Sequence, residues 1–385
     1  MSRVYMDNSA TTPMHAQVYE AMKPYFIEKF GNPSSLYAAG REARKAVEEA
    51  REKAAKAIGA KPDEIIFTSG GTESDNLAIR GVVRALRKKG NHIITSAIEH
   101  HAVLDTCVAL KEDGYKITIL PVDKYGKVSL EDLEQAITDD TILISVMMAN
   151  NEVGTIQPVA AIGKIAKARG IVFHTDAVQA IGNLPVNVDD LHCDLLSLSA
   201  HKFYGPKGMG ILFVRKGTKI KPSNFGGMQE RKMRPGTENV PGIVGTGAAV
   251  ELASENMQEN VKKVRALRDR LIEGLLQINH VHLNGHPIER LPGNINVSVQ
   301  FVEGESLILS LDLKGIAISS GSACTSGSLD PSHVLLAMGL DHQSAHGSLR
   351  FSLGHLNTDE EISYVLEIMP EIVTRLRSMS PVYTG

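Results

Sequence analysis

The sequence predicts an α/β protein with one large, mainly parallel sheet covered by helices and a second, smaller α+β domain. Between residues 64 and 177, short apolar segments rich in β-branched residues alternate with amphipathic segments. These apolar segments are nearly uniform in character, which is typical of strands buried on both faces of a parallel sheet. A long amphipathic segment beginning at residue 255 ends this alternation. The change in pattern therefore predicts a second domain.

The alternating elements follow one another along the chain. EIIFTS (64–69) and HIITSAI (92–98) are expected to be strands, and the segments 74–90 and 102–114 are expected to be helices. The alternation continues through YKITILPV, SLEDLEQAI, TILISVMMA, VAAIGKIAKARG and IVFHTDA. Ligands of such sheets bind beyond the carboxyl ends of the strands, so residues that follow strands are the functional candidates.

The pattern changes near Asp194. DLLSLSA and GMGILFV are two strand-like segments with only a Gly/Pro turn between them, which predicts an antiparallel pair within the sheet. The segment 255–278 predicts a long amphipathic helix that bridges the two domains, and NINVSV and LRFSL predict further strands. We therefore assign residues 12–254 to the large domain, and residues 1–11 and 255–385 to the small one.

Charge and cysteine content limit the class of protein. The 385 residues include 41 basic and 44 acidic ones, with a formal net charge of −3. This near balance argues against nucleic acid or an anionic membrane as the main partner, and no apolar run is long enough to cross a bilayer. The N-terminus has no apolar signal core, and the three distant cysteines form no C-x-x-C pair. The expected location is a reducing cytoplasm.

Two strand ends carry candidate residues for an anion and a cation. TSGGTES (68–74) lies between a strand and a helix, where small residues and a helix N-terminus offer free N–H groups to a phosphate. A glycine turn with a Ser/Thr cap explains this segment equally well. Asp176 ends a strand, where it either caps a turn or pairs with a cation in the crevice. Taken alone, Asp176 is better explained as a cap.

A lysine and a cysteine are the candidate reactive groups. Lys202 follows an apolar strand in SLSAHKFYGPKG, and desolvation lowers the pKa of a lysine and makes it a nucleophile toward carbonyl groups. A solvated turn lysine is the ordinary alternative. Cys324 lies among glycines and serines in SSGSACTSGSLDPSHV, which predicts an exposed and reactive thiol. Cys107 and Cys193 are interpreted as buried, inert side chains.

Together these residues meet the requirements of pyridoxal phosphate. Its phosphate needs backbone donors, its pyridinium nitrogen needs a carboxylate, and its aldehyde needs a lysine. His100 ends another strand and could stack on the ring. The spacing of the histidines matches no metal motif, so no metal is expected.

Several motifs of the chain, taken together, are similar to those of a known family. The chain resembles the NifS/IscS-type cysteine desulfurases, within the class V aminotransferase-like pyridoxal-phosphate enzymes of fold type I. The resemblance covers essentially the whole chain and rests on YMDNSATTP, GNPSSLY, SGGTESDN, EHHAVLDTC, ANNEVG, HTDAVQA, SLSAHKFYGPKG, RPGTENV, SSGSACTSGSLDPSHV and SLRFSLG. It implies a seven-stranded sheet in the large domain and a small domain that carries Cys324.

The resemblance also implies a role for each candidate residue. Contacts to the cofactor are expected from Gly71, Thr72, His100, Asn151, Asp176, Gln179, Ser199, His201, Lys202 and, from a second subunit, Thr237. Asn151 and Arg350 would bind the substrate, and the catalytic residues would be Lys202, Cys324 and His100. Within the doublets Asn150–Asn151 and His100–His101, Asn151 and His100 are chosen by alignment to the motifs.

The implied activity is the conversion of L-cysteine to L-alanine, with the sulfur left on Cys324 as a persulfide. A homodimer is implied by Thr237, and an iron–sulfur scaffold protein is the implied sulfur acceptor. The chain ends at SMSPVYTG soon after its last predicted helix, so stable scaffold binding is less expected than the persulfide. Selenocysteine lyase and class V aminotransferase activities are the alternatives on this fold. Cys324 argues against the aminotransferase, which needs no thiol.

Overall fold

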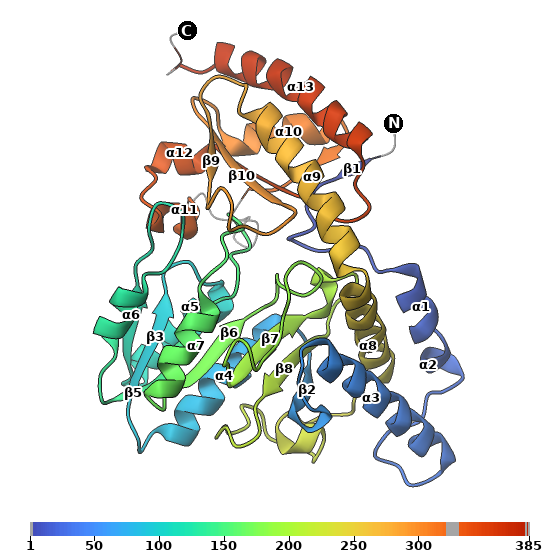
Figure 1. Cartoon of the computed structure of the whole chain (residues 1–385). Coiled ribbons are helices and arrows are strands. Elements are labelled where there is room, and N and C mark those ends of the chain that lie inside the picture. Colours follow the sequence, from blue (N-terminus) through green and yellow to red (C-terminus); the bar gives the residue numbers. More distant parts are fainter. Residues whose placement is uncertain (1–2, 321–330, 382, 384–385) are drawn as a thin grey trace.

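The computed structural model describes residues 3–320, 331–381 and 383 (Figure 1). Seven of the described strands form the central sheet, in the order β2 (Ile65–Thr68), β8 (Gly210–Val214), β7 (Leu195–Ser199), β6 (Val172–Asp176), β5 (Thr141–Ser145), β3 (His92–Ser96) and β4 (Lys116–Leu120). β8 runs antiparallel to both of its neighbours, and the other pairs are parallel. The predicted mainly parallel sheet and its antiparallel pair are confirmed.

Helices cover both faces of this sheet. The α-helices of this part of the chain are α1 (Ala16–Met22), α2 (Pro24–Ile27), α3 (Ala38–Ala57), α4 (Gly71–Leu86), α5 (His101–Glu112), α6 (Leu130–Ala136), α7 (Val159–Ala168) and α8 (Val240–Glu255). Short 3-10 helices span Pro62–Glu64, Ala200–Lys202 and Glu230–Lys232. Because successive strand residues point to opposite faces, Leu195 and Leu212 pack with α4 and α5, whereas Leu196 and Phe213 pack with α3, α7 and α8. Burial on both faces explains why the strands lack polar alternation.

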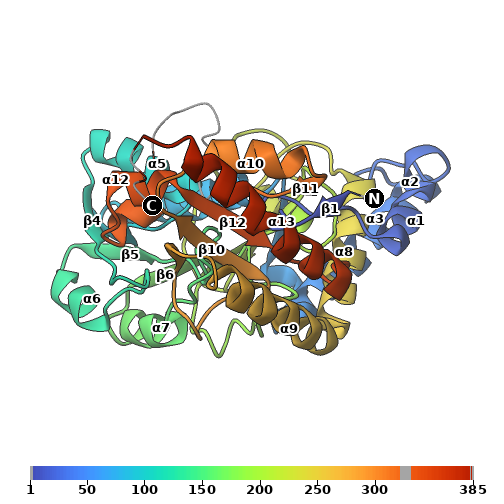
Figure 2. The same cartoon turned by 90° about the horizontal axis from the view of Figure 1, so that it is seen from above.

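Most of the remaining elements pack around a separate apolar core. The remaining elements are β1 (Val4–Tyr5), α9 (Met257–Leu275), β9 (Val281–Asn284), β10 (Asn294–Val299), α10 (Gly304–Asp312), β11 (Ile316–Ala317), α11 (His333–Ala337), α12 (His342–His346), β12 (Ser348–Ser352) and α13 (Asp359–Ser378). Of these, α11 and α12 instead pack with Ile98, Met147 and Val153. β10 pairs antiparallel with β9 and β12, and β1 pairs parallel with β11. Leu271, Val297 and Phe351 belong to this core, over which α13 and α10 lie in Figure 2.

Two helices, rather than one, connect the two cores. The helix predicted over 255–278 is α9, and it follows α8 with only Asn256 between them. α8 contributes Ile243 and Val250 to the core of the large sheet, while α9 contributes Leu271 to the smaller core. In Figure 1 the two helices follow one another along one diagonal, from the smaller part down to the large sheet. The division into domains at residues 12–254 stays a prediction.

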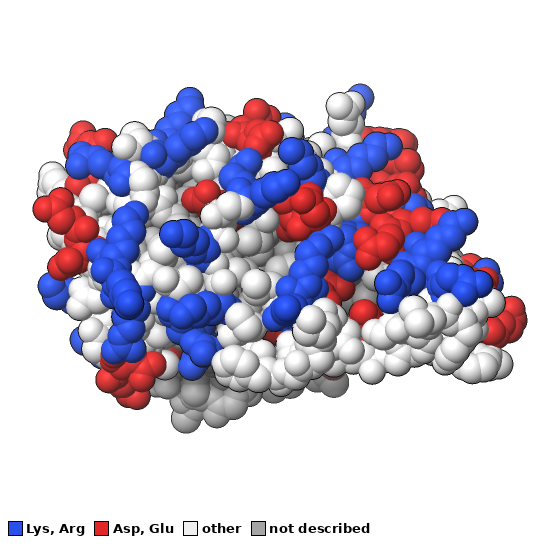
Figure 3. All heavy atoms as spheres, turned by 90° about the horizontal axis from the view of Figure 1, so that it is seen from below, with Lys and Arg blue, Asp and Glu red and all other residues white. Residues whose placement is uncertain are grey.

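The face seen from below carries charges of both signs among uncharged atoms, and an uncharged strip follows part of one edge (Figure 3). None of the helices in the described ranges has both the length and the apolar character that a membrane crossing requires.

Candidate active site

Lys202 ends the 3-10 turn that follows β7. Its Nζ donates to the backbone carbonyls of Ser9, at 2.5 Å, and Ala10, at 2.8 Å. These carbonyls belong to the N-terminal segment between β1 and α1, which no pattern in the sequence linked to Lys202. The turn therefore places the lysine in a half-buried position at the carboxyl end of the sheet, where two backbone carbonyls accept from its Nζ, and not on the open surface.

Asp176 ends β6, the strand next to β7 in the sheet. Its side chain is 6% exposed. Burial raises the pKa of this carboxyl, while the nearby His100 and Lys202 lower it. Asp176 Oδ1 also accepts the N–H of Val178 at 2.9 Å, which is the turn-capping contact considered from sequence. The capping and charge-pairing interpretations are therefore compatible, because each uses a different part of the carboxyl.

The first turn of α4 faces the same region. A Cβ on Gly71 would lie 2.9 Å from Val178 Cγ2 and 3.6 Å from Ser199 Cβ, so the helix N-terminus approaches this turn closely only because residue 71 is glycine. No side chain caps α4, and Thr72 at its second position is exposed. The free N–H groups of the first turn are thus available to an anion.

His201 Nδ1 lies 3.1 Å from Thr11 Oγ1, which again ties the lysine turn to the N-terminal segment. Burial, followed by the charges of Lys202 and Lys207, lowers the pKa of His201 to about 4. The imidazole is therefore neutral at physiological pH, so it can act as a hydrogen-bond donor to an anion without adding charge to the site.

In each of the doublets Asn150–Asn151 and His100–His101, the two residues make different contacts. Asn150 is fully buried and bonds inward, accepting from the N–H groups of Glu152 and Val153 and donating to the Ile98 carbonyl. Asn151 is only partly buried. His100 interacts electrostatically with Asp176, whereas His101 contacts the ring of His333 at 4.9 Å between centroids. These contacts support the choice of Asn151 and His100.

Arg350 and Gln179 complete the described part of the site. Arg350 is 2% exposed; its Nη1 donates to the Asn151 carbonyl at 3.1 Å and its Nη2 to Asp7 Oδ1 at 2.9 Å. Its buried Nε has no partner among the described residues. Gln179 Nε2 donates to the Ser9 carbonyl at 3.1 Å. Within the described ranges, Arg350 thus keeps one donor without a partner beside Asn151. Its ion pair with Asp7 could not be read from any local pattern.

Two candidates and two further cysteines remain to be placed. Thr237 is exposed. Cys324 lies outside the described residues. Cys107 and Cys193 are free and buried, and burial raises the pKa of each thiol to about 12. The prediction that these two side chains are buried is confirmed.

Two buried acids near the site were missed by the sequence analysis. Glu99 is fully buried at the end of the β3 region, and burial raises its pKa to about 8. Asp75, on α4, interacts with Asp176, and burial raises its pKa well above the ordinary value. Both belong to motifs already noted, EHHAVLDTC and SGGTESDN, and an acid placed within an apolar pattern is the signal that could have identified them.

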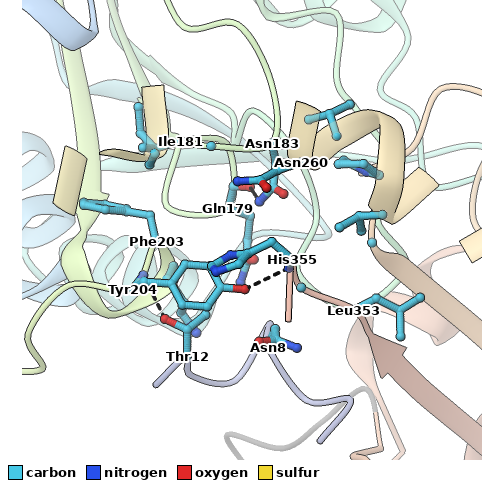
Figure 4. Close-up of a pocket in the computed structure, with 18 of the residues that line it drawn as sticks. Asn8, Thr12, Gln179, Ile181, Asn183, Phe203, Tyr204, Asn260, Leu353 and His355 are labelled. Carbon is cyan, nitrogen blue, oxygen red and sulfur yellow. Dashed lines mark hydrogen bonds between the residues drawn. The ribbon is translucent and has the colours of Figure 1, made fainter. Parts of the chain in front are cut away.

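A cavity of about 300 Å³ lies beside Lys202. Gln179 and Lys202 are the candidate residues that line it, together with Ser9, Asn256 and Asn260. Figure 4 shows Phe203 from the large-sheet part and Leu353 from the smaller part on opposite walls. The candidate site therefore lies where the two cores meet.

The residues present fit pyridoxal phosphate: a helix N-terminus that begins with glycine and packs closely on the turn after β6, a buried strand-end carboxylate and a lysine on the adjacent strand end. Fold and site define the class of enzymes that hold this cofactor at the edge of a large, mainly parallel sheet. Residues 4–365 match the aminotransferase class-V family, and the chain belongs to it. The family resemblance and the fold class predicted from the sequence are confirmed.

The similar proteins agree in name. Cysteine desulfurase IscS of Methanosarcina thermophila is 61% identical over 378 residues, which cover 98% of this chain and 94% of that protein. Cysteine desulfurase IscS of Dictyoglomus turgidum is 58% identical over 379 residues, covering 98% and 96%.

Solved structures match as well. A NifS-like protein has a TM-score of 0.92 at 44% identity, covering 97% of this chain and 100% of that one. SspA in complex with cysteine has a TM-score of 0.83 at 38% identity, covering 92% and 100%.

Proposed function

We propose that this chain is a pyridoxal-phosphate-dependent cysteine desulfurase, which converts L-cysteine to L-alanine and leaves the sulfur on Cys324. The observation that carries the proposal is the convergence of Lys202, Asp176 and the uncapped start of α4 at one edge of the sheet. The names of relatives at 61% and 58% identity support the choice of cysteine as substrate. The family match alone is shared by the aminotransferase alternative, whereas the names of these relatives favour the desulfurase.

Different residues within the described ranges would bind different parts of the cofactor. The N–H groups of Gly71 and Thr72, with Ser199 and His201, would hold the phosphate, and Asp176 would pair with the ring nitrogen. Gln179 and Asn151 would contact the ring oxygen, and His100 would stack on the ring. When bound, pyridoxal phosphate supplies an electron sink for the pair left on the substrate Cα.

Arg350 and Lys202 act on the substrate. The free Nε of Arg350 gives a carboxylate a charged donor beside Asn151, and the bond from Nη2 to Asp7 fixes the guanidinium plane. The carbonyls of Ser9 and Ala10 hold Lys202 Nζ in place. Lys202 Nζ would take the Cα proton of the substrate and return a proton to carbon, with His100 as a second proton carrier.

Cys324 would accept the sulfur. Its thiolate attacks the substrate sulfur, so an S–S bond forms while the C–S bond breaks and the electron pair of that bond stays on carbon. Protonation of this carbon gives L-alanine, and Cys324 becomes a persulfide. L-cysteine and one thiol thus yield L-alanine and one persulfide, without an external oxidant.

The proposal also includes the oligomeric state, the sulfur acceptor and the location of the enzyme. The chain would act as a homodimer in which Thr237 reaches the phosphate of the other subunit, and the exposed Phe225, at 78%, and Met228, at 68%, support a contact in this region. An iron–sulfur scaffold protein would receive the sulfur. The free thiols of Cys107 and Cys193 support a reducing cytoplasm as the location.

A single-turnover experiment tests the activity. The purified enzyme is mixed with L-cysteine without reductant, and alanine and the mass of the Cys324 peptide are measured. We expect one alanine and one added sulfur on Cys324 per site. Alanine with no sulfur on Cys324 would remove Cys324 from the mechanism. No alanine at all would contradict the desulfurase assignment and favour an aminotransferase. In that case the Cys324→Ala variant should turn over its amino-acid substrate as fast as the wild type.

A further inference from the structure

The two ends of the segment that carries Cys324 attach to adjacent parts of the substrate site. Ser319, before this segment, exchanges two backbone hydrogen bonds with Arg350, at 3.3 and 2.7 Å. Ser332, after it, donates its hydroxyl to Glu152 Oε2 at 2.5 Å. Arg350 Nη1 in turn donates to the carbonyl of Asn151, the neighbour of Glu152. Both described ends therefore meet at the loop that presents Asn151.

The side chain of Glu152 connects Ser332 to the loop that carries Asn151. It is 5% exposed and Ser332 is 4% exposed, so water does not compete for their hydrogen bond. The backbone of Glu152 is fixed independently, because its carbonyl accepts from Asn294 and Asn296, at 3.2 Å each, and its N–H is held by Asn150. Loss of the carboxyl would therefore release Ser332 while Asn151 keeps its place.

Burying a carboxyl is costly unless it is hydrogen-bonded, and Ser332 is the partner that the described residues give to its side chain. Ser332 is also the N-cap of α11, and its hydroxyl accepts from Leu335 N–H at 3.2 Å. One hydroxyl thus fixes the start of α11 and joins it to the substrate loop. In the sequence, Ser332 lies eight residues after Cys324.

We propose that Glu152 is a positioning residue for sulfur transfer. It holds the chain after Cys324 against the loop that carries Asn151, and so sets where the thiol is delivered relative to the substrate, without touching the substrate itself. The proposal rests on the desulfurase function proposed above. It assigns to Glu152 an effect on the sulfur-transfer step that is separate from cofactor and substrate binding.

Two variants of the same size distinguish this role. Glu152→Met removes the acceptor but keeps the length of the side chain, and Glu152→Gln keeps a carbonyl oxygen for the Ser332 hydroxyl. Ser332→Gly removes the donor from the other side, where glycine is a tolerated N-cap. Each holoenzyme is mixed with L-cysteine, and both the change in the visible cofactor spectrum and the appearance of the Cys324 persulfide are followed.

We expect the Glu152→Met and Ser332→Gly enzymes to show the wild-type spectral response to L-cysteine but to form the persulfide at least about tenfold more slowly. Glu152→Gln should restore the rate. Persulfide formation at the wild-type rate in both Glu152→Met and Ser332→Gly would overturn the proposal, and so would a lost spectral response in Glu152→Met, since Glu152 would then hold the substrate loop. A wild-type enzyme that forms no persulfide would instead refute the desulfurase function itself. Should Glu152→Met fail to fold, Ser332→Gly decides alone.

Discussion

Two buried acids of the candidate site, Asp75 and Asp176, differ in which form, protonated or charged, their surroundings favour. Burial, followed by the charges of Asp176 and Glu99, raises the pKa of Asp75 well above its ordinary value. Burial also raises the pKa of Asp176, but His100 and Lys202 lower it. The interaction between these two buried carboxyls disfavours the ionisation of both at once. The charge therefore belongs to Asp176, which has cationic neighbours, and the proton belongs to Asp75.

This difference predicts opposite outcomes for two conservative substitutions. Asp176→Asn removes the charge that the cofactor ring requires, and we expect alanine formation in a single turnover to fall at least about a hundredfold. Asp75→Asn replaces a protonated carboxyl by a neutral amide of the same size, so the rate should stay close to that of the wild type. A comparable loss in both variants would show that Asp75 also carries charge.

Glu99 gives a pH dependence of stability. Its pKa is about 8 in the folded chain, above its ordinary value, so the folded state keeps a proton that the unfolded state loses as the pH rises from about 4.5. The stability that Glu99 contributes is complete below this pH and is lost as the pH rises to about 8. We expect the free energy of unfolding, from denaturant titrations at pH 5, 6.5 and 8, to fall more steeply in the wild type than in Glu99→Gln. Parallel slopes would mean that Glu99 is ionised in the fold.

At the scale of elements, the start of α4 depends on a residue without a side chain. Gly71→Ala would place a methyl group 2.9 Å from Val178 Cγ2 and push the helix away from the turn after β6. Overpacking of this kind costs about 1–3 kcal/mol, so we expect the affinity of the apoenzyme for pyridoxal phosphate to fall about tenfold in an absorbance titration.

Gly81→Ala is the matched control for this substitution. It lies on the same helix, and its Cβ would lie 2.9 Å from the Lys221 carbonyl. It should lower the melting temperature yet leave the affinity for the cofactor unchanged. If both substitutions weakened binding equally, global destabilisation rather than the helix N-terminus would be the cause.

The strands and helices between residues 64 and 177 were predictable because each carries its own periodicity. α3 carries the same signal, with Ala43, Val47, Ala50 and Ala54 on its buried side, although the sequence analysis did not single it out. α8 is different. Its glycines, alanines and valines are buried around most of the helix, so no apolar stripe distinguishes it from a buried strand or loop.

At the scale of the whole molecule, the site combines segments far apart in the sequence. Lys202, Asp176 and the start of α4 were recognisable because each follows a strand. Their contacts with Ser9 and Ala10, and the pairing of Arg350 with Asp7, join residues more than 190 positions apart. No local pattern encodes such contacts, so the roles of Arg350 and Thr237 came from the family resemblance alone.

The proposed homodimer predicts the effect of a surface charge. Phe225→Asp places a charge on an apolar side chain that is 78% exposed and near Thr237 in the sequence. We expect sedimentation to show a shift toward monomer, together with weaker cofactor binding as the Thr237 contact is lost. Leu313→Asp, at a residue that is 86% exposed in the smaller part, is the control and should change neither. An unchanged dimer in Phe225→Asp would place the interface elsewhere.

The ion pair between Asp7 and Arg350 also has a consequence for protein synthesis. The two residues are 343 positions apart, and at translation rates of about 5–20 residues per second the first waits about 20–70 s for the second to be made. During this time the strands of the large sheet have already emerged, but the amino-terminal segment lacks its partner. A nascent chain therefore lacks this ion pair, and with it the substrate contact proposed for Arg350, until the final tenth of the message is read.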